Sequence, residues 1–313
     1  MTSILAAFAL LPDPTENTGC ADLICSDLEA LERRFVARRP RRAGRMTRMA
    51  CVGASGCLAG YDHGETFGKR LGVFHGTALG NLQETCDVVR QVVEEPDQLP
   101  SPIRFSCSMS NMSSFFVAQV TGARGPNLLV SQGVLSFEGA LLAAVLAQEV
   151  GECEHVLVGA TDGSLSSREE YVTTLGCPAA TCLGEGSGWL LLGPESPGAC
   201  GDLLHVELLP GGCGDETAWA VEVAGRCRDL AHREEPIRIM PGTGITQEDS
   251  RALLALLPGA RLQPYLDETG LYPTASAAGL AARLAHPRRA ATYAHVARND
   301  ERQSSLTLIR VRP

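Results

Sequence analysis

The sequence predicts an α/β fold in which helices cover buried sheets. Short apolar segments that suit strands alternate with longer segments in which apolar residues recur at helical spacing. The chain has 313 residues, 44% of them hydrophobic, which is enough for one large domain or two fused halves. We expect an N-terminal half over residues 1–200 and a C-terminal half over residues 201–313, folded as one compact unit.

The first half begins with an apolar run at residues 3–11 that suits a strand. Leu28, Leu31 and Phe35 then have helical spacing, with Ser26 or Asp27 as the N-cap. Prolines at positions 96, 100 and 102 indicate a loop. The elements expected in this half are strands at residues 3–11, 71–77, 128–133, 155–159 and 188–192, and helices at residues 26–35, 46–58, 81–94, 111–120 and 136–150.

The segment at residues 136–150 is the clearest helix of the chain. Its apolar side chains point to several sides, as expected for a helix in the centre of the protein. Ser136 can accept hydrogen bonds from the N–H groups of the first turn. Glu138 lies near the positive end of the helix dipole, where a carboxylate is favourable.

The second half continues the alternation of strands and helices. Gly184, Gly186 and Gly188 form a glycine-rich stretch that a strand follows, so it indicates a tight turn and not a pyrophosphate site at a helix start. The segment at residues 305–311 alternates between apolar and polar residues, as a terminal strand does. The elements expected here are strands at residues 203–209, 237–240 and 305–311, and helices at residues 249–257 and 279–284.

Composition excludes several classes of function. The net charge of −9 argues against general binding to nucleic acid, and no apolar run approaches the ~20 residues of a membrane span. The 12 cysteines are dispersed and none forms a Cys-x-x-Cys pair, so we expect reduced thiols, no metal site and a cytoplasmic protein. Residues 4–12 are apolar but lack the basic start and cleavage site of a signal peptide.

Arginine is concentrated in one short segment. Eight arginines lie between Arg33 and Arg48 in an otherwise acidic chain. The simpler interpretation is a solvated helix face. The alternative is a docking patch for an acidic partner, since guanidinium groups bind carboxylates and phosphates well.

Short motifs recur along the chain at residues 72–77, 101–102 with 111–112, 124–127, 158–163 and 183–190. Taken in order, they resemble those of β-ketoacyl synthases over nearly the whole chain. Each is modest alone, but their shared order and spacing make coincidence improbable. The resemblance implies a thiolase-like fold with five layers, αβαβα, built from two related halves.

The residues that carry the chemistry of that family are missing. Its nucleophilic cysteine corresponds to Val134, and its two histidines correspond to Pro241 and Leu271. The lysine of the second histidine motif becomes Leu266, and the glycine-rich gating loop, which falls near residues 298–301, is also absent. Valine forms no thioester, and proline and leucine carry no proton. Gln132 lies two positions before Val134, so a gap-free alignment does not bring it to the position of the cysteine.

This pattern resembles chain length factors, which are non-catalytic partners of ketosynthases in type II polyketide, aryl polyene and related pathways. The resemblance implies a heterodimer with an active β-ketoacyl synthase, whose acyl tunnel this chain would shape. No cofactor would bind directly, because an acyl carrier protein presents the acyl chains on phosphopantetheine. The residues implied at the partner interface and tunnel are Arg104, Ser108, Met109, Phe115 and Phe116; Arg38, Arg39, Arg41 and Arg42 would dock the carrier protein.

Other functions remain open at this point. A divergent decarboxylase would need the missing histidines, and an acyltransferase would need another nucleophile such as Cys107. A homodimeric scaffold that retains only the fold is a third alternative. For Met109, Phe115 and Phe116, plain packing in the core or in a dimer is the simpler interpretation.

Overall fold

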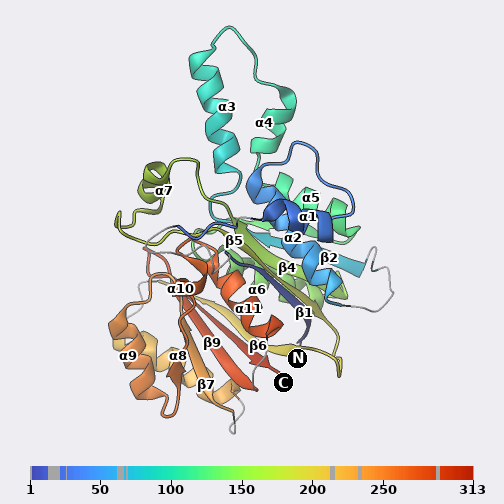
Figure 1. The fold of residues 1–313 in the computed structure, drawn as a ribbon. Helices are drawn as coiled ribbons and strands as arrows, with labels where there is room; N and C mark the ends of the chain where they lie inside the picture. Colours follow the sequence, from blue (N-terminus) through green and yellow to red (C-terminus); the bar gives the residue numbers. More distant parts are fainter. Residues whose placement is uncertain are drawn as a thin grey trace.

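The computed structural model describes residues 2–12, 22–25, 27–61, 67, 70–211, 216–231, 235–286 and 290–312. Within them, ten strands form one continuous sheet in the order β3-β2-β4-β5-β1-β6-β10-β9-β7-β8, with helices on both faces (Figure 1). The strands are β1 (Thr2–Leu10), β2 (Leu71–Gly76), β3 (Asn127–Val130), β4 (His155–Asp162), β5 (Gly186–Gly193), β6 (Gly201–Leu209), β7 (Ile237–Pro241), β8 (Arg261–Leu262), β9 (Ala291–Arg298) and β10 (Ser304–Val311).

The two ends of this sheet repeat one topology. The first five strands have the order β3-β2-β4-β5-β1, and the last five have the equivalent order β8-β7-β9-β10-β6 when followed from the opposite edge. In both sets the second strand from the edge (β2 or β7) has two parallel neighbours, and the remaining pairs are antiparallel. Strands β1 and β6 join the two sets. The predicted α/β class with two related halves is therefore confirmed.

Helices form three layers around the two halves of the sheet. One apolar cluster joins α2 and α5 to the first half, and another joins α8 and α9 to the second. The largest cluster joins α6 and α11 to strands of both halves, so these two helices form the middle of five layers, αβαβα. The helices of these layers are α1 (Leu28–Phe35), α2 (Arg45–Ala59), α5 (Met112–Thr121), α6 (Ser136–Glu149), α8 (Glu216–Leu230), α9 (Gln247–Leu256) and α11 (Ala275–Ala285).

Four shorter or peripheral helices complete the fold. Helices α3 (Leu82–Glu94) and α4 (Pro102–Ser108) form a hairpin that projects from the body of the molecule (Figure 1). No residue of α3 is buried, although its side chains have a strongly amphipathic pattern. Helices α7 (Arg168–Leu175) and α10 (Leu266–Thr269) lie in connections between strands.

Several elements of the structure were not expected. The loop indicated by the prolines is present at residues 95–101, but residues 102–108 form a helix, because Pro102 occupies the first helical turn, where no N–H is needed. Helix α8 and strand β9 were not expected. Trp219, Val223 and Cys227 do have helical spacing, whereas β9 places Thr292 and His295 inside the core and so lacks an apolar pattern.

The expected role of Ser136 was also wrong. Ser136 is the first residue of α6, and its hydroxyl accepts from the N–H of Gln132 and not from the helix. The strand expected at residues 128–133 ends at Val130, and the remaining residues form a turn. At α1, the Asp27 side chain accepts a hydrogen bond from the N–H of Ala30, while Ser26 lies outside the described residues.

Candidate functional site

The turn between β3 and α6 is where the resemblance places a nucleophile. Gly133 has a φ of 56°, which glycine adopts without strain. The Ser136 hydroxyl accepts a hydrogen bond from the N–H of Gln132 at 2.8 Å and donates one to the carbonyl of Gly133 at 2.6 Å. These bonds hold a sharp turn directly before the helix. Val134 lies in this turn, half-buried, so an apolar side chain takes the place of a nucleophile.

Gln132 lies in the same turn and is exposed. Its amide oxygen packs over α6, 2.8 Å from the position that a Cβ on Gly139 would take. A larger residue at position 139 would therefore displace this amide. The turn forms with Val134 two residues before α6, as the gap-free alignment has it.

The positions that correspond to the two histidines flank the central layer. Pro241 ends β7, and the next N–H, of Gly242, donates to the carbonyl of Val296 at 2.8 Å. Leu271 lies between α10 and α11, and its N–H donates to the carbonyl of Cys182 at 2.9 Å. Both side chains are half-buried and neither can accept or donate a proton.

A chain of buried polar side chains runs through the second half beside Pro241. Nδ1 of His295 on β9 lies 3.4 Å from Oε1 of Glu138 on α6, and both side chains are fully buried. On the other side of the ring, Nε2 of His295 lies 3.0 Å from the hydroxyl of Tyr265. A Cβ on Gly242 would lie 2.7 Å from the same Nε2, so glycine is needed for this close approach.

Burial controls the charge of these groups. Desolvation raises the pKa of Glu138 to about 7, although its own backbone N–H and the nearby Ser276 hydroxyl offset part of the rise. Desolvation lowers the pKa of His295 to about 3, so the imidazole is neutral at pH 7. The favourable charge expected for Glu138 at the helix start is therefore opposed by burial. In the sequence, His295 was one of seven scattered histidines and gave no sign of this role.

The connection between β9 and β10, where the family's gating loop falls, is a tight hairpin. Asn299 and Gln303 exchange backbone and side-chain hydrogen bonds of 2.9 Å across it. Arg298, at its base, lies 3.3 Å from Asp249 and stacks 4.1 Å over the ring of Trp219. This part of the chain is therefore fixed by specific contacts and lacks the glycines of a gate.

The residues expected at a partner interface lie on α4, α5 and the turn between them. Met109 and Phe115 are exposed, at 43% and 51%. Arg104 is exposed as well, and the hydroxyl of Ser108 donates to the carbonyl of Phe105 at 2.8 Å. Phe116 is half-buried and packs on the core of the first half, with its ring 5.5 Å from that of Phe115.

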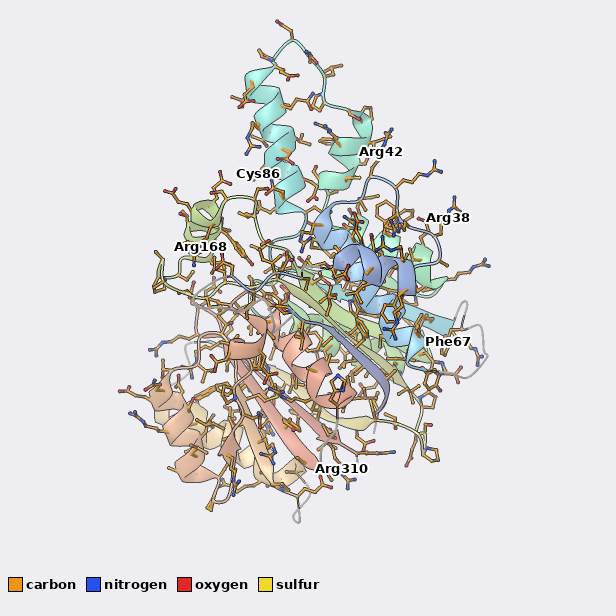
Figure 2. The ribbon with its side chains drawn as sticks, in the orientation of Figure 1. Arg38, Arg42, Phe67, Cys86, Arg168 and Arg310 are labelled. Carbon is orange, nitrogen blue, oxygen red and sulfur yellow. The ribbon has the colours of Figure 1, made fainter. Side chains whose placement is uncertain are left out.

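Six of the eight clustered arginines divide into two groups. Arg45 and Arg48 form ion pairs with Glu185 and Glu32, two carboxylates that are almost fully buried. These two arginines hold the fold together. The four residues expected to dock a carrier protein are exposed on the loop between α1 and α2. They are Arg38, Arg39, Arg41 and Arg42. Figure 2 labels Arg38 and Arg42, and Arg42 lies near the foot of the α3–α4 hairpin.

A cleft of about 950 Å³ opens beside this loop, between α3 and α4. Arg42, Arg90 and Arg104 line it together with acidic residues of α3. Cys107 also lines it, but burial raises the pKa of this thiol. Its thiol donates to the carbonyl of Arg42 at 3.4 Å, an arrangement that disfavours the reactive thiolate.

In the part of the chain that the structure describes, no group of three or more histidine, cysteine or acidic residues is arranged to hold a metal ion. No disulfide joins any two of the ten described cysteines. None of the described helices has the length and apolar character needed to cross a membrane.

Comparison with known proteins identifies the family. The family model for the β-ketoacyl synthase N-terminal domain matches residues 12–174, just over half of the chain. A granaticin polyketide putative β-ketoacyl synthase 1 from Streptomyces violaceoruber is 30% identical over 149 residues, which are 45% of this chain and 35% of that protein. A chloroplastic 3-oxoacyl-[acyl-carrier-protein] synthase I from Hordeum vulgare is 28% identical over 113 residues, 36% of this chain and 24% of that protein. The matched regions thus span about a third or less of these relatives.

Solved structures share the fold over the full length of the chain. The ishigamide ketosynthase/chain length factor superimposes with a TM-score of 0.78 and 20% identity, covering 100% of this chain and 99% of that one. A ketosynthase complex with a type II polyketide synthase acyl-carrier protein gives 0.76 at 15% identity, covering 99% of both chains. A β-ketoacyl synthase from Burkholderia phymatum gives 0.75 at 12% identity, covering 100% and 99%. With the family model matched and the thiolase fold shared throughout, the chain belongs to the β-ketoacyl synthase family.

Proposed function

We propose that this chain is a non-catalytic subunit that pairs with an active β-ketoacyl synthase and shapes its acyl tunnel, as a chain length factor does. The observation that carries this proposal is the turn before α6. Hydrogen bonds of Ser136 hold this turn, yet Val134 offers no nucleophile there. Pro241 and Leu271 offer no base, so condensation would depend on the residues of the partner.

The distribution of exposed apolar side chains supports a large interface at one end of the sheet. Of the fifteen large hydrophobic side chains exposed among the described residues, nine lie in residues 89–128. Four of the nine lie on α3 and its connection to α4, three on α4 and the turn after it, and one each on α5 and β3. Among the described strands, β3 is an edge strand that pairs with β2 alone. Exposed apolar patches and free strand edges both favour association. We therefore place the partner subunit against β3 and α5.

The tunnel role is assigned to the turn after α4. Met109 is exposed within the proposed interface, close in sequence to Arg104 and Ser108. A side chain at this place would close the end of a tunnel in the partner, and its bulk would limit the length of the acyl chain. Phe115 would contact the partner, whereas Phe116 would support the interface from within the core.

The carrier-protein role is assigned to the exposed arginines between α1 and α2. Arg45 and Arg48 are already neutralised by buried carboxylates, so they are excluded from this role. Arg38, Arg39, Arg41 and Arg42 remain available to the phosphate and carboxylates of an acyl carrier protein. The carrier protein would bring acyl chains on its phosphopantetheine, and this subunit itself would need no cofactor.

The test is co-expression with a candidate ketosynthase that carries the intact cysteine and both histidines, followed by gel filtration and a malonyl-carrier condensation assay. The proposal expects a 1:1 complex that condenses only when both chains are present. Met109→Ala should lengthen the product and Met109→Trp should shorten it, with no change in complex formation. A complex whose activity and product length are unaffected by this chain would contradict the proposed role.

A homodimeric scaffold is the second candidate, because the same apolar band would also suit a second copy of this chain. The experiment above separates the two. A stable homodimer that does not exchange with the ketosynthase would favour the scaffold.

A further inference from the structure

Three side chains from distant parts of the sequence meet in the core of the second half. Glu138 comes from the first turn of α6, His295 from β9 and Tyr265 from the segment before α10. The carboxyl group lies 3.4 Å from Nδ1 of the imidazole, and the phenol hydroxyl lies 3.0 Å from Nε2. All three are fully buried or within 1% of it, so water does not reach them in this conformation.

The surroundings supply no charge to balance an ionised carboxylate. Among the described residues, the polar groups nearest the carboxylate of Glu138 are the Ser276 hydroxyl and Nδ1 of His295. Neither is aligned for a hydrogen bond to it in this conformation, and within that part of the chain both also lack any other hydrogen-bond partner. Asp162 on β4 is another fully buried acid, but Thr77, Thr274 and two backbone N–H groups hold it. Tyr272 is buried and neutral, and His75 of β2 stacks on Trp189 and bonds to Ser113. On β6, Asp202 pairs with Arg312. His205 and Glu207 of the same strand pair with each other, and Glu207 also pairs with Arg226.

A neutral imidazole has one N–H and one free nitrogen, so it donates on one side and accepts on the other. If Glu138 carries a proton, its O–H donates to Nδ1, and the Nε2–H of His295 donates to the oxygen of Tyr265. If Glu138 has lost its proton, the Nδ1–H donates to the carboxylate, and the hydroxyl of Tyr265 donates to Nε2. Each arrangement satisfies both ring nitrogens. The protonation of one carboxyl group therefore decides the direction of the whole chain.

We propose that Glu138, His295 and Tyr265 form a buried proton-binding site in which the direction of the hydrogen bonds reverses when Glu138 releases its proton. The raised pKa of the carboxyl group, about 7, brings this reversal near neutral pH, while the imidazole stays neutral throughout. Because Glu138 lies four residues after Val134 on the helix that begins at the turn, the site links that turn to β9 of the second half. The exchange of a proton involves no other co-reactant than water.

The experiment is a pH titration of the histidine tautomer by NMR on the full chain with isotope-labelled histidine. Ring ¹⁵N and ¹³Cδ2 shifts distinguish the Nδ1–H from the Nε2–H form, and His295→Gln assigns the signal. We expect His295 to change from Nε2–H at pH 5.5 to Nδ1–H at pH 8.5, with a midpoint within about one unit of pH 7. A packing role alone would leave the tautomer unchanged.

His75 is the matched control in the same spectra. It is also fully buried, its pKa is also lowered to about 3, and its Nδ1 lies 3.1 Å from the hydroxyl of Ser113, with no carboxyl group in contact. Its tautomer should stay constant over this range. Glu138→Gln, whose amide donates to Nδ1 at every pH, should fix His295 as Nε2–H. The proposal is wrong if wild-type His295 keeps one tautomer from pH 5.5 to 8.5. It is also wrong if the change of tautomer persists in Glu138→Gln. The wild-type titration alone tests the proposal even if Glu138→Gln does not fold.

Discussion

The hydroxyl of Ser136 accepts the N–H of Gln132 at 2.8 Å, and this bond closes the turn that presents Val134 ahead of α6. Under the proposed function, this turn is a nucleophile turn whose tip carries an inert side chain. A protein that had lost only its cysteine would recover activity when the cysteine is restored. Here the positions expected for the two histidines also hold Pro241 and Leu271, whose side chains transfer no proton.

The first prediction is that Val134→Cys does not create a condensing enzyme. The thiol would have no imidazole to accept its proton and no second histidine to support decarboxylation. Mass spectrometry of a malonyl-carrier and acyl-carrier mixture should show no product above that of the unmutated chain. Substantial condensation by the single variant would mean that proton-handling groups are present elsewhere.

The second prediction concerns Leu128 on the edge strand β3, which is 43% exposed. Leu128→Asp should weaken the partner complex at least about tenfold, because an apolar contact is lost and a carboxylate is buried against the partner. Val221→Asp is the matched control. Val221 is similarly exposed, at 47%, but lies on α8 in the second half. Equal effects of both changes in a binding titration would exclude β3 from the interface.

The sequence predicts much of the fold because the strands that are buried on both faces are continuous apolar runs. Strands β2, β4 and β5 are buried along their whole length, and each was expected at nearly its observed position. Strand β9 was missed because Thr292 and His295 interrupt its apolar character. His295 is tolerated in the core only because Tyr265, thirty residues earlier in the chain, meets it there. Such a long-range pair leaves no local pattern.

The arginine cluster shows the same limit at the candidate site. In the sequence its eight members look alike, and charge alone gives no reason to separate them. The fold brings Glu185, 140 residues away, to Arg45, and Glu32 to Arg48. Only these tertiary contacts show which arginines serve stability and which remain free to bind a partner.

The third prediction separates those two groups of arginines. Arg45→Ala should lower the free energy of unfolding by about 3 kcal/mol, because it leaves the buried carboxylate of Glu185 without its cation. Arg38→Ala should change stability by less than about 0.5 kcal/mol, as expected for an exposed residue. Urea unfolding measures both.

Carrier-protein binding should depend on the other group of arginines. Replacement of Arg38, Arg39, Arg41 and Arg42 by alanine should weaken this binding in a salt-dependent way, with no loss of fold.

The fourth prediction uses two glycines with opposite surroundings. Gly225 lies within α8, and a Cβ there would meet nothing within 4 Å. Gly225→Ala should therefore stabilise the chain by about 0.5–1 kcal/mol. Gly188 on β5 packs against α11, where a Cβ would lie 2.1 Å from the backbone of Ala277. Gly188→Ala should prevent this contact between the first half and the central layer. Thermal melting should show a higher midpoint for the first variant and a much lower one, or no soluble protein, for the second.

The last prediction is the pH dependence of stability that follows from Glu138. Its pKa rises from 4.5 to about 7 on folding, so the folded chain holds a proton that the unfolded chain releases between these values. Stability from this group is therefore fully present below pH 4.5 and is lost as the pH rises to 7. Glu138→Gln cannot titrate. Relative to wild type, it should gain a few kcal/mol of unfolding free energy between pH 4.5 and 7, and no more above pH 7. The pKa of His295 is lowered to about 3, so this group destabilises the folded chain as the pH falls below its ordinary value of 6.5. His295 is present in both proteins, and its contribution therefore cancels in the difference between them. Urea unfolding of the two proteins at pH 5, 6, 7 and 8 measures this difference. A difference that stays constant across the series would show that the carboxyl group does not change its protonation in this range.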